Sequence, residues 1–178
     1  MALWRAHGYA HTTVADICRA AGVSKALFYF YFPRKEDVLF EVGVLSTDAA
    51  RSVAADMLAQ PYDVGAVITA VLASLEETMR SSPPELIIEA ILEGYRQALA
   101  CHEHLERTSV IFAEVFARAQ QDGKLGGHLD VAHVATVAQS LVSEGARHWA
   151  AGAYGDRSFA EVVGRDITAL VNGYPRRP

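Results

Sequence analysis

Apolar residues recur at helical spacing along almost the whole chain, and no segment shows the sustained alternation that marks a half-buried strand. The clearest stripe places one face of a single helix between residues 64 and 79. Pro61 precedes this segment, and two serines and two prolines at 81–84 follow it, which marks both helix ends. The pattern therefore predicts an all-α fold. The stripe consists of Val64, Val67, Ile68, Val71, Leu72, Leu75 and Met79.

The same periodicity predicts eight further helices, about nine in total. Their ranges are a short helix before His7, then 13–21, 24–32, a long helix at 35–59, 84–100, 102–122, 131–152 and 158–173. The first helices are short and joined by tight turns, whereas the later ones are long and rich in alanine. We therefore expect two domains, residues 1–45 and residues 46–178.

Residues 13–32 carry the local signals of two helices joined by a very short turn. Thr13 is a helix N-cap, and Asp16 stands three residues later, as in a capping box. Gly22 stands where the chain must turn sharply, which favours a positive φ, and Ser24 caps the next helix. Helices joined so closely cross steeply. This is a helix-turn-helix, whose second helix can enter the major groove of DNA.

The second of these helices contains five consecutive aromatic residues at 28–32. They cover more than one helical turn, so they cannot all face the core. We assign Phe28 and Phe32 to the core and expect Tyr29 and Tyr31 to face DNA. The basic side chains of Lys25 and of residues 34 and 35 add phosphate donors around them.

The segment from Gly8 to about Leu39 carries the pattern G-Y-x3-T-V-x-D-I-x3-A-G-V-S-x-A-x-F-Y-x-Y-F-x3-E-x-V. This pattern resembles the DNA-binding domain of the tetracycline-repressor (TetR) family of bacterial regulators. The resemblance implies a homodimer that binds a palindromic operator, usually as a repressor. It also implies release from DNA when a small molecule fills a pocket in the C-terminal domain. Neither a cofactor nor an enzymatic activity is expected.

The resemblance also implies individual roles. Thr13 and Lys35, with the two tyrosines, fall on positions that commonly hold the phosphate backbone, whereas Lys25 and Phe30 fall on positions that more often read bases. Leu27 stands where the family often has a hydroxyl, so an apolar contact, for example to a thymine methyl, replaces a polar one. The predicted DNA-binding residues are Thr13, Ser24, Lys25, Leu27, Tyr29, Phe30, Tyr31 and Lys35.

The net charge of −5 at first argues against a polyanionic partner. Its distribution changes that conclusion. Residues 1–45 hold five basic and four acidic side chains, whereas the remaining residues hold eleven basic and seventeen acidic side chains. A few well-placed cations suffice to meet phosphates, so the overall charge does not exclude nucleic acid.

Cysteine content and hydropathy indicate the compartment. Cys18 and Cys101 lie far apart, so we expect two reduced, buried thiols rather than a disulfide framework. The longest apolar run, residues 66–75, is shorter than the ~20 residues that a membrane span needs, and the N-terminus lacks a signal-peptide pattern. We therefore expect a cytoplasmic protein.

Two other functions compete with DNA binding. Residues 101–104 (Cys-His-Glu-His) superficially suggest a metal site, but only Cys101 and His104 share a helical face, so no metal is expected. A helical enzyme that uses Glu89 or Glu93 in a pocket remains the alternative function. Glutamates 76, 77, 89 and 93 are otherwise interpreted as solvated helix faces.

The helix at 84–100 is apolar around much of its circumference, so it should run through the middle of the C-terminal domain. A cavity beside it would suit an apolar or aromatic ligand, although the same residues can equally fill the core. In the resembled family the last two helices form the dimer, and small residues such as Ala138 and Gly145 allow close helix approach. The candidate ligand-binding residues are Met79, Glu89, Tyr95, Phe112, Phe116 and Trp149.

Overall fold

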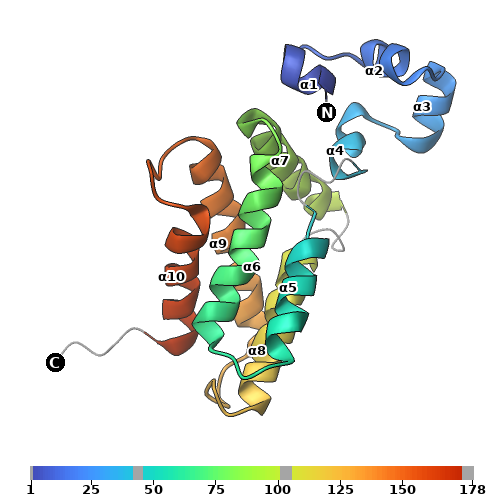
Figure 1. The fold of residues 1–178 in the computed structure, drawn as a ribbon. Coiled ribbons are helices and arrows are strands. Elements are labelled where there is room, and N and C mark those ends of the chain that lie inside the picture. The colour runs from blue at the N-terminus through green and yellow to red at the C-terminus, as the bar shows by residue number, and fades with distance from the viewer. Residues whose placement is uncertain (1, 42–45, 101–105, 174–178) are drawn as a thin grey trace.

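The computed structural model describes residues 2–41, 46–100 and 106–173. Within these ranges the regular secondary structure is helical and no strand is present, which confirms the predicted all-α fold (Figure 1). The elements are α1 (Ala2–His7), α2 (Val14–Ala21), α3 (Lys25–Tyr31), the 3-10 turn η1 (Lys35–Asp37), α4 (Val38–Glu41), α5 (Asp48–Leu58), α6 (Val64–Arg80), α7 (Pro84–Ala100), α8 (Glu106–Gln121), α9 (Val131–Ala150) and α10 (Phe159–Asn172).

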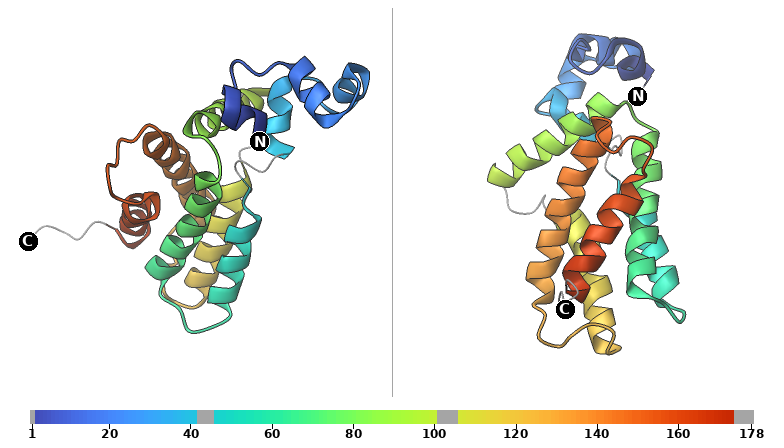
Figure 2. Two further views of the ribbon diagram at one scale, coloured as in Figure 1. Left: turned by 45° about the horizontal axis from the view of Figure 1, so that its top comes forward. Right: turned by 90° about the vertical axis from the view of Figure 1, so that its left-hand side faces the viewer.

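Helices α1 to α4 form a small body at one end of a bundle made by α5 to α10 (Figures 1 and 2). In the bundle α6 packs against α5 and α10, while α9 packs against α7, α8 and α10. All seven residues of the predicted stripe on α6 are buried. Burial of this apolar stripe stabilises the bundle, because α6 alone could not shield it from water.

The predicted long helix at 35–59 is wrong. The chain forms η1 and the one-turn helix α4, and a separate helix α5 begins at Asp48. Ser46 and Thr47 are not helical, and the Ser46 hydroxyl oxygen accepts a hydrogen bond from the backbone N–H of Asp48 at 3.5 Å. Serine, threonine and aspartate compete in this way for backbone groups that a continuous helix would use. Residues 42–45 lie outside the described ranges.

The interpretation of glutamates as solvated faces is wrong for Glu76 and Glu93, which are both buried. Glu76 on α6 accepts a hydrogen bond from the backbone N–H of Ala160 at 3.0 Å through Oε2, and its other oxygen pairs with Arg80. Ala160 lies in the first turn of α10, where backbone N–H groups have no partner within the helix. Glu76 therefore caps α10 from a different helix and fixes the contact between the two.

Gly145 confirms the predicted close approach of helices, here between α9 and α10 of the same chain. A Cβ atom at this position would collide with Val163 and would lie 3.3 Å from the ring of Phe159. The absence of a side chain lets the two backbones approach, and Ala138 on the same helix is fully buried.

The cluster at Cys101–His104 lies outside the described residues. Within 2–41, 46–100 and 106–173, no group of three or more histidine, cysteine, aspartate or glutamate side chains could hold a metal ion. No helix in these ranges is both long and apolar enough to cross a membrane.

Candidate nucleic-acid interface

Helix α2 begins with the predicted capping box. The Thr13 hydroxyl oxygen accepts a hydrogen bond from the backbone N–H of Asp16 at 3.2 Å, and the Asp16 carboxylate accepts one from the backbone N–H of Thr13 at 3.0 Å. The Thr13 hydroxyl also donates to that carboxylate at 2.6 Å. These hydrogen bonds lower the pKa of Asp16. The box fixes the start of α2 and leaves Thr13 on the surface.

The turn between α2 and α3 has the predicted geometry. Gly22 adopts φ 68° and ψ 27°, the left-handed conformation, and the next residue, Val23, donates to the carbonyl of Cys18 at 3.0 Å. Ser24 then caps α3, because its hydroxyl oxygen accepts from the backbone N–H of Leu27 at 3.1 Å. The turn thus needs a residue that tolerates positive φ and, two positions later, a side chain that caps the next helix.

Helix α3 buries one side chain and exposes its neighbours. Phe28 is 4% exposed and contacts Phe32, which is partly buried, as predicted for these two rings. Phe30 is 78% exposed and Leu27 is 45% exposed. Tyr29, Tyr31 and Lys25 are exposed as well. The structure therefore presents five of the eight predicted DNA-binding side chains on the outer surface of one helix, with Ser24 at its N-terminus.

Lys35 lies in η1 rather than on α3. Its ammonium donates to the carbonyls of Tyr9 at 3.1 Å and Thr12 at 3.3 Å, and it lies 4.1 Å from the centroid of the Tyr9 ring. An ammonium has three N–H donors, so these two bonds leave one for a phosphate oxygen. Lys35 thus joins the segment between α1 and α2 to η1 while remaining partly exposed.

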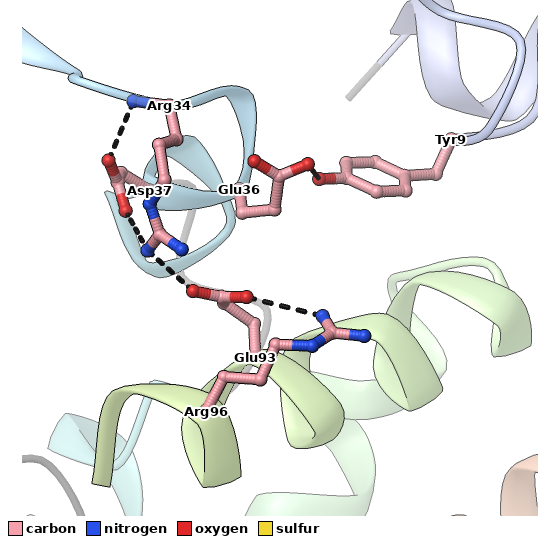
Figure 3. A network of polar contacts seen from close by, with 6 residues as sticks. All are labelled: Tyr9, Arg34, Glu36, Asp37, Glu93 and Arg96. Atoms are coloured by element: carbon pink, nitrogen blue, oxygen red, sulfur yellow. Dashed lines mark hydrogen bonds and ion pairs between the residues drawn. The ribbon is translucent and has the colours of Figure 1, made fainter. Parts of the chain in front are cut away.

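A network of polar contacts joins the small domain to α7 (Figure 3). The Arg34 guanidinium bonds Asp37 at 2.8 Å and reaches across to Glu93 of α7 at 2.6 Å. Arg96 bonds the other oxygen of Glu93 at 3.2 Å. The Glu93 side chain is 1% exposed, whereas both arginines are about half exposed. Its buried charge is therefore compensated by two guanidiniums from different domains.

Two further contacts border this network. The Tyr9 hydroxyl donates to Glu36 at 3.3 Å, and burial together with the Glu36 charge raises the pKa of Tyr9 (Figure 3). Arg5 of α1 donates to the backbone carbonyl of Ser81, directly after α6. The small domain is thus attached through polar contacts to both α6 and α7.

Sequence reasoning misses the contacts of Arg34 and Glu93. It places Arg34 against phosphate and treats Glu93 as a solvated or catalytic carboxylate. The enzyme alternative loses its support at Glu93, because this carboxylate is engaged by two arginines. The partners lie 59 positions apart, so no local pattern indicates the pair. Glu89 is partly buried on the same helix.

A cavity of about 60 Å³ lies inside the bundle. Met79 is the one predicted ligand-binding residue that lines it. Among the others, Phe112 and Phe116 are fully buried with ring centroids 5.7 Å apart, and Tyr95 is exposed. Trp149 is partly buried near the Arg80 guanidinium. The lining comes from Ser46, Thr47, Leu75, Thr78, Met79, Ile91, Gln139, Val142, Ser143, Ala146 and Phe159.

One polar group in this lining is unsatisfied. Gln139 donates through Nε2 to the Ser143 hydroxyl at 3.0 Å, while its Oε1 is buried without a hydrogen-bond partner in the described part of the chain. A buried carbonyl oxygen without a donor is costly, so this atom would accept a hydrogen bond from a ligand favourably.

Comparison with known proteins agrees with this architecture. Residues 1–42 match the family described as bacterial regulatory proteins, tetR family. The resemblance predicted from the sequence is thereby confirmed, and the matched segment contains the capping box, the turn, α3 and Lys35. No curated protein shows significant similarity to the chain.

Solved structures extend the likeness to the whole fold. FadR from Thermus thermophilus, a TetR-family transcriptional repressor in complex with lauroyl-CoA, has a TM-score of 0.78 and 24% identity, covering 100% of this chain and 92% of that one. The fatty acid degradation regulator FadR from Bacillus halodurans has a TM-score of 0.71 and 21% identity, and the match covers 99% of this chain and 92% of that one. A TetR/AcrR-family regulator from Thermobifida fusca has a TM-score of 0.55 and 28% identity, and the match covers 98% of this chain and 93% of that one. The chain therefore has the helical fold of these transcriptional regulators.

Proposed function

We propose that this chain, whose N-terminal segment is that of the tetR family, is a ligand-responsive repressor that binds a palindromic operator in the cytoplasm. Residues 1–45 would form the DNA-binding domain and residues 46–178 the domain for ligand binding and dimerisation. The observation that carries the proposal is the exposed surface of α3, which displays Lys25, Leu27 and three aromatic side chains although Phe28 anchors the same helix in the core.

The proposed contacts divide into two kinds. Thr13, Tyr29, Tyr31 and Lys35 would hold phosphates, which fixes position without reading sequence, whereas the side chains at the centre of the outer face of α3 would read base edges. If about six phosphates are neutralised per dimer, affinity should fall by about three orders of magnitude between 50 and 200 mM salt.

A selection from a random duplex DNA library tests this proposal directly. The full chain should enrich one palindromic sequence, and its binding should show the steep salt response. Tyr29→Phe should weaken all sequences by a similar factor, whereas Lys25→Ala should change sequence preference. A flat salt response or the absence of an enriched sequence would contradict DNA regulation.

The dimer is proposed to form through α9 and α10. Val137 of α9 and Leu170 of α10 remain partly exposed on these two helices, and a second copy would cover them. The two copies of α3 should then lie about 34–36 Å apart to meet successive major grooves. Sedimentation at micromolar concentration should give a dimer, and a monomer would exclude this arrangement.

The ligand is proposed to be a small molecule with an apolar or aromatic body and a hydrogen-bond donor. Its apolar part would lie against Met79, Ile91 and Phe159, and its donor would meet Gln139. The cavity of about 60 Å³ is far below the roughly 300 Å³ at which drug-sized pockets begin. Ligand binding must therefore separate α6, α7 and α9.

This separation supplies a route to the DNA-binding domain. Ile91 lines the cavity and Glu93 lies two residues further along α7, so displacement of α7 moves the carboxylate that Arg34 contacts. A ligand changes operator affinity only if it binds the two arrangements differently. We expect the coupling to be about 5- to 150-fold in operator affinity.

Lauroyl-CoA, which the Thermus thermophilus relative binds, and benzoate are suitable first probes. The operator obtained by selection would be titrated with each probe in a mobility-shift assay. Glu93→Gln should reduce the effect of an active probe on operator affinity while leaving the affinity of the probe for DNA-free protein unchanged. An effective probe whose action is unaltered in this variant would exclude the proposed route.

A further inference from the structure

The outer face of α3 has an unusual composition for a surface that reads bases. From Ser24 to Tyr31 the sequence is SKALFYFY, which holds no arginine, asparagine, glutamine, aspartate or glutamate. Hydrogen-bond readout in the major groove rests mainly on such side chains and on lysine. Lys25 is therefore the one side chain in this stretch that can make a charged contact with a base.

The helical geometry places three apolar residues together on the side opposite the buried anchor. Successive residues are rotated by about 100° around the axis of an α-helix, so Ala26 and Phe30 lie opposite Phe28 and Leu27 lies beside Phe30. All three of these outward residues are exposed. Lys25 and Tyr29 lie on one flank of this apolar patch, and Tyr31 lies on the other.

Nothing in residues 2–41, 46–100 and 106–173 explains structurally why the patch is exposed. Phe30 is 78% exposed and its ring contacts Tyr31 on the same helix at a centroid distance of 5.1 Å, so it is not anchored in the core. Single exposed apolar residues are ordinary, but a contiguous apolar patch on the outer face of a helix commonly marks a binding surface.

We propose that Ala26, Leu27 and Phe30 read the C5-methyl groups of thymine, and that each operator half-site presents clustered thymines to this patch beside a guanine contacted by Lys25. The thymine methyl is the apolar group that base edges expose in the major groove, and small or aromatic apolar side chains are suited to contact it. This inference rests on the proposed function, because it specifies which sequences that interface selects.

The test removes the methyl groups and changes nothing else on the base. In the operator enriched from the random duplex library, each thymine would be replaced singly by uracil, which keeps the base pair and lacks the methyl. Loss of one buried methyl should weaken binding about fourfold, and at least two positions in each half-site should respond. Thymines outside the half-sites serve as controls, and replacing them by uracil should leave the affinity unchanged.

Variants of the exposed residues assign the contacts. Leu27→Ala and Phe30→Ala should each reduce the discrimination between thymine and uracil at different positions of the half-site. Lys25→Ala is the matched control, and it should retain that discrimination while losing preference at a guanine. Circular dichroism would verify folding, which these exposed positions should leave unaffected.

The outcomes separate the two proposals. If replacing thymine by uracil leaves the affinity unchanged at every position of a specifically bound operator, methyl reading is overturned and the proposed regulation through DNA stands. Methyl reading is likewise overturned if Phe30→Ala weakens binding equally for thymine and uracil operators. Failure to enrich any sequence would instead overturn the proposed function, and methyl reading with it.

Discussion

The contact between Arg34 and Glu93 predicts an asymmetric response to mutation. Arg34→Ala removes a guanidinium that is about half exposed from a carboxylate that is 1% exposed and that also bonds Arg96. A hydrogen bond to a charged group contributes about 1.5–3 kcal/mol, and partial exposure of the arginine places the loss near the lower end, at about 2 kcal/mol. Glu93→Gln should cost less, about 1 kcal/mol, because the two arginines left behind remain solvated.

These values can be measured by urea and thermal unfolding at one protein concentration, since a dimer has a concentration-dependent transition. For a chain of this size, 2 kcal/mol lowers the melting temperature by about 4–8 °C. Arg165→Ala, which removes an exposed pair with Asp166, is the control and should change stability by less than about 0.5 kcal/mol.

The double variant Arg34→Ala/Glu93→Gln decides whether the two groups act together. Its loss should be smaller than the sum of the single losses by about 1 kcal/mol, because Arg34 and Glu93 contact each other directly and either single substitution already removes that shared contact. Additivity to within about 0.3 kcal/mol would show that the pair does not couple the domains.

Three further outcomes are expected. Gly22→Ala should lower the free energy of unfolding by about 1 kcal/mol through its backbone conformation alone, since φ is 68° and no atom obstructs the new methyl; an unchanged urea midpoint would refute this. Gly145→Ala should cost about 1–3 kcal/mol because the methyl would collide with Val163, and a neutral result in thermal melts would show that α9 and α10 separate easily. The Asp16 carboxyl should titrate below its ordinary pKa in an NMR titration, and Thr13→Ala should raise that pKa. The stability that the Asp16 carboxylate contributes is present above the pKa of Asp16 in the unfolded chain, and it is lost as the pH falls through the lower pKa of the folded protein.

The helix-turn-helix could be predicted closely because its determinants are local. Thr13 and Asp16 are three residues apart, and Gly22 and Ser24 are separated by one. The side chains of Thr13, Asp16 and Ser24 each bond a backbone group within their own turn, and Gly22 supplies the left-handed backbone conformation. These short-range contacts can therefore be predicted from the spacing of the residues in the sequence. Helical geometry also predicts that only some of the five consecutive aromatics are buried, because they cannot share one face.

The features that sequence reasoning missed depend on distant partners. Glu76 meets Ala160 across 84 positions, and Glu93 meets Arg34 across 59. On its own helix each glutamate resembles an ordinary surface residue, and only tertiary packing shows which one is buried and paired. The break before Asp48 was missed for a different reason: apolar periodicity continues through it, whereas the Ser46 hydroxyl accepts from the backbone N–H of Asp48 at the start of α5.

The attachments of the N-terminal domain to Ser81 and Glu93 have a mechanical consequence. Ser81 follows α6 directly and Glu93 lies within α7, against which α4 also packs, so these two contacts define a line about which α1 to α4 can turn together. Helix α3 lies at the far side of the domain from α7 (Figure 1), so it sits at the end of a lever arm whose fulcrum is that line. A slight turn of α7 would sweep α3 through a larger arc than α7 itself travels. In the proposed dimer, the separation of the two α3 helices would thus change through a movement too small to disturb the core of either domain.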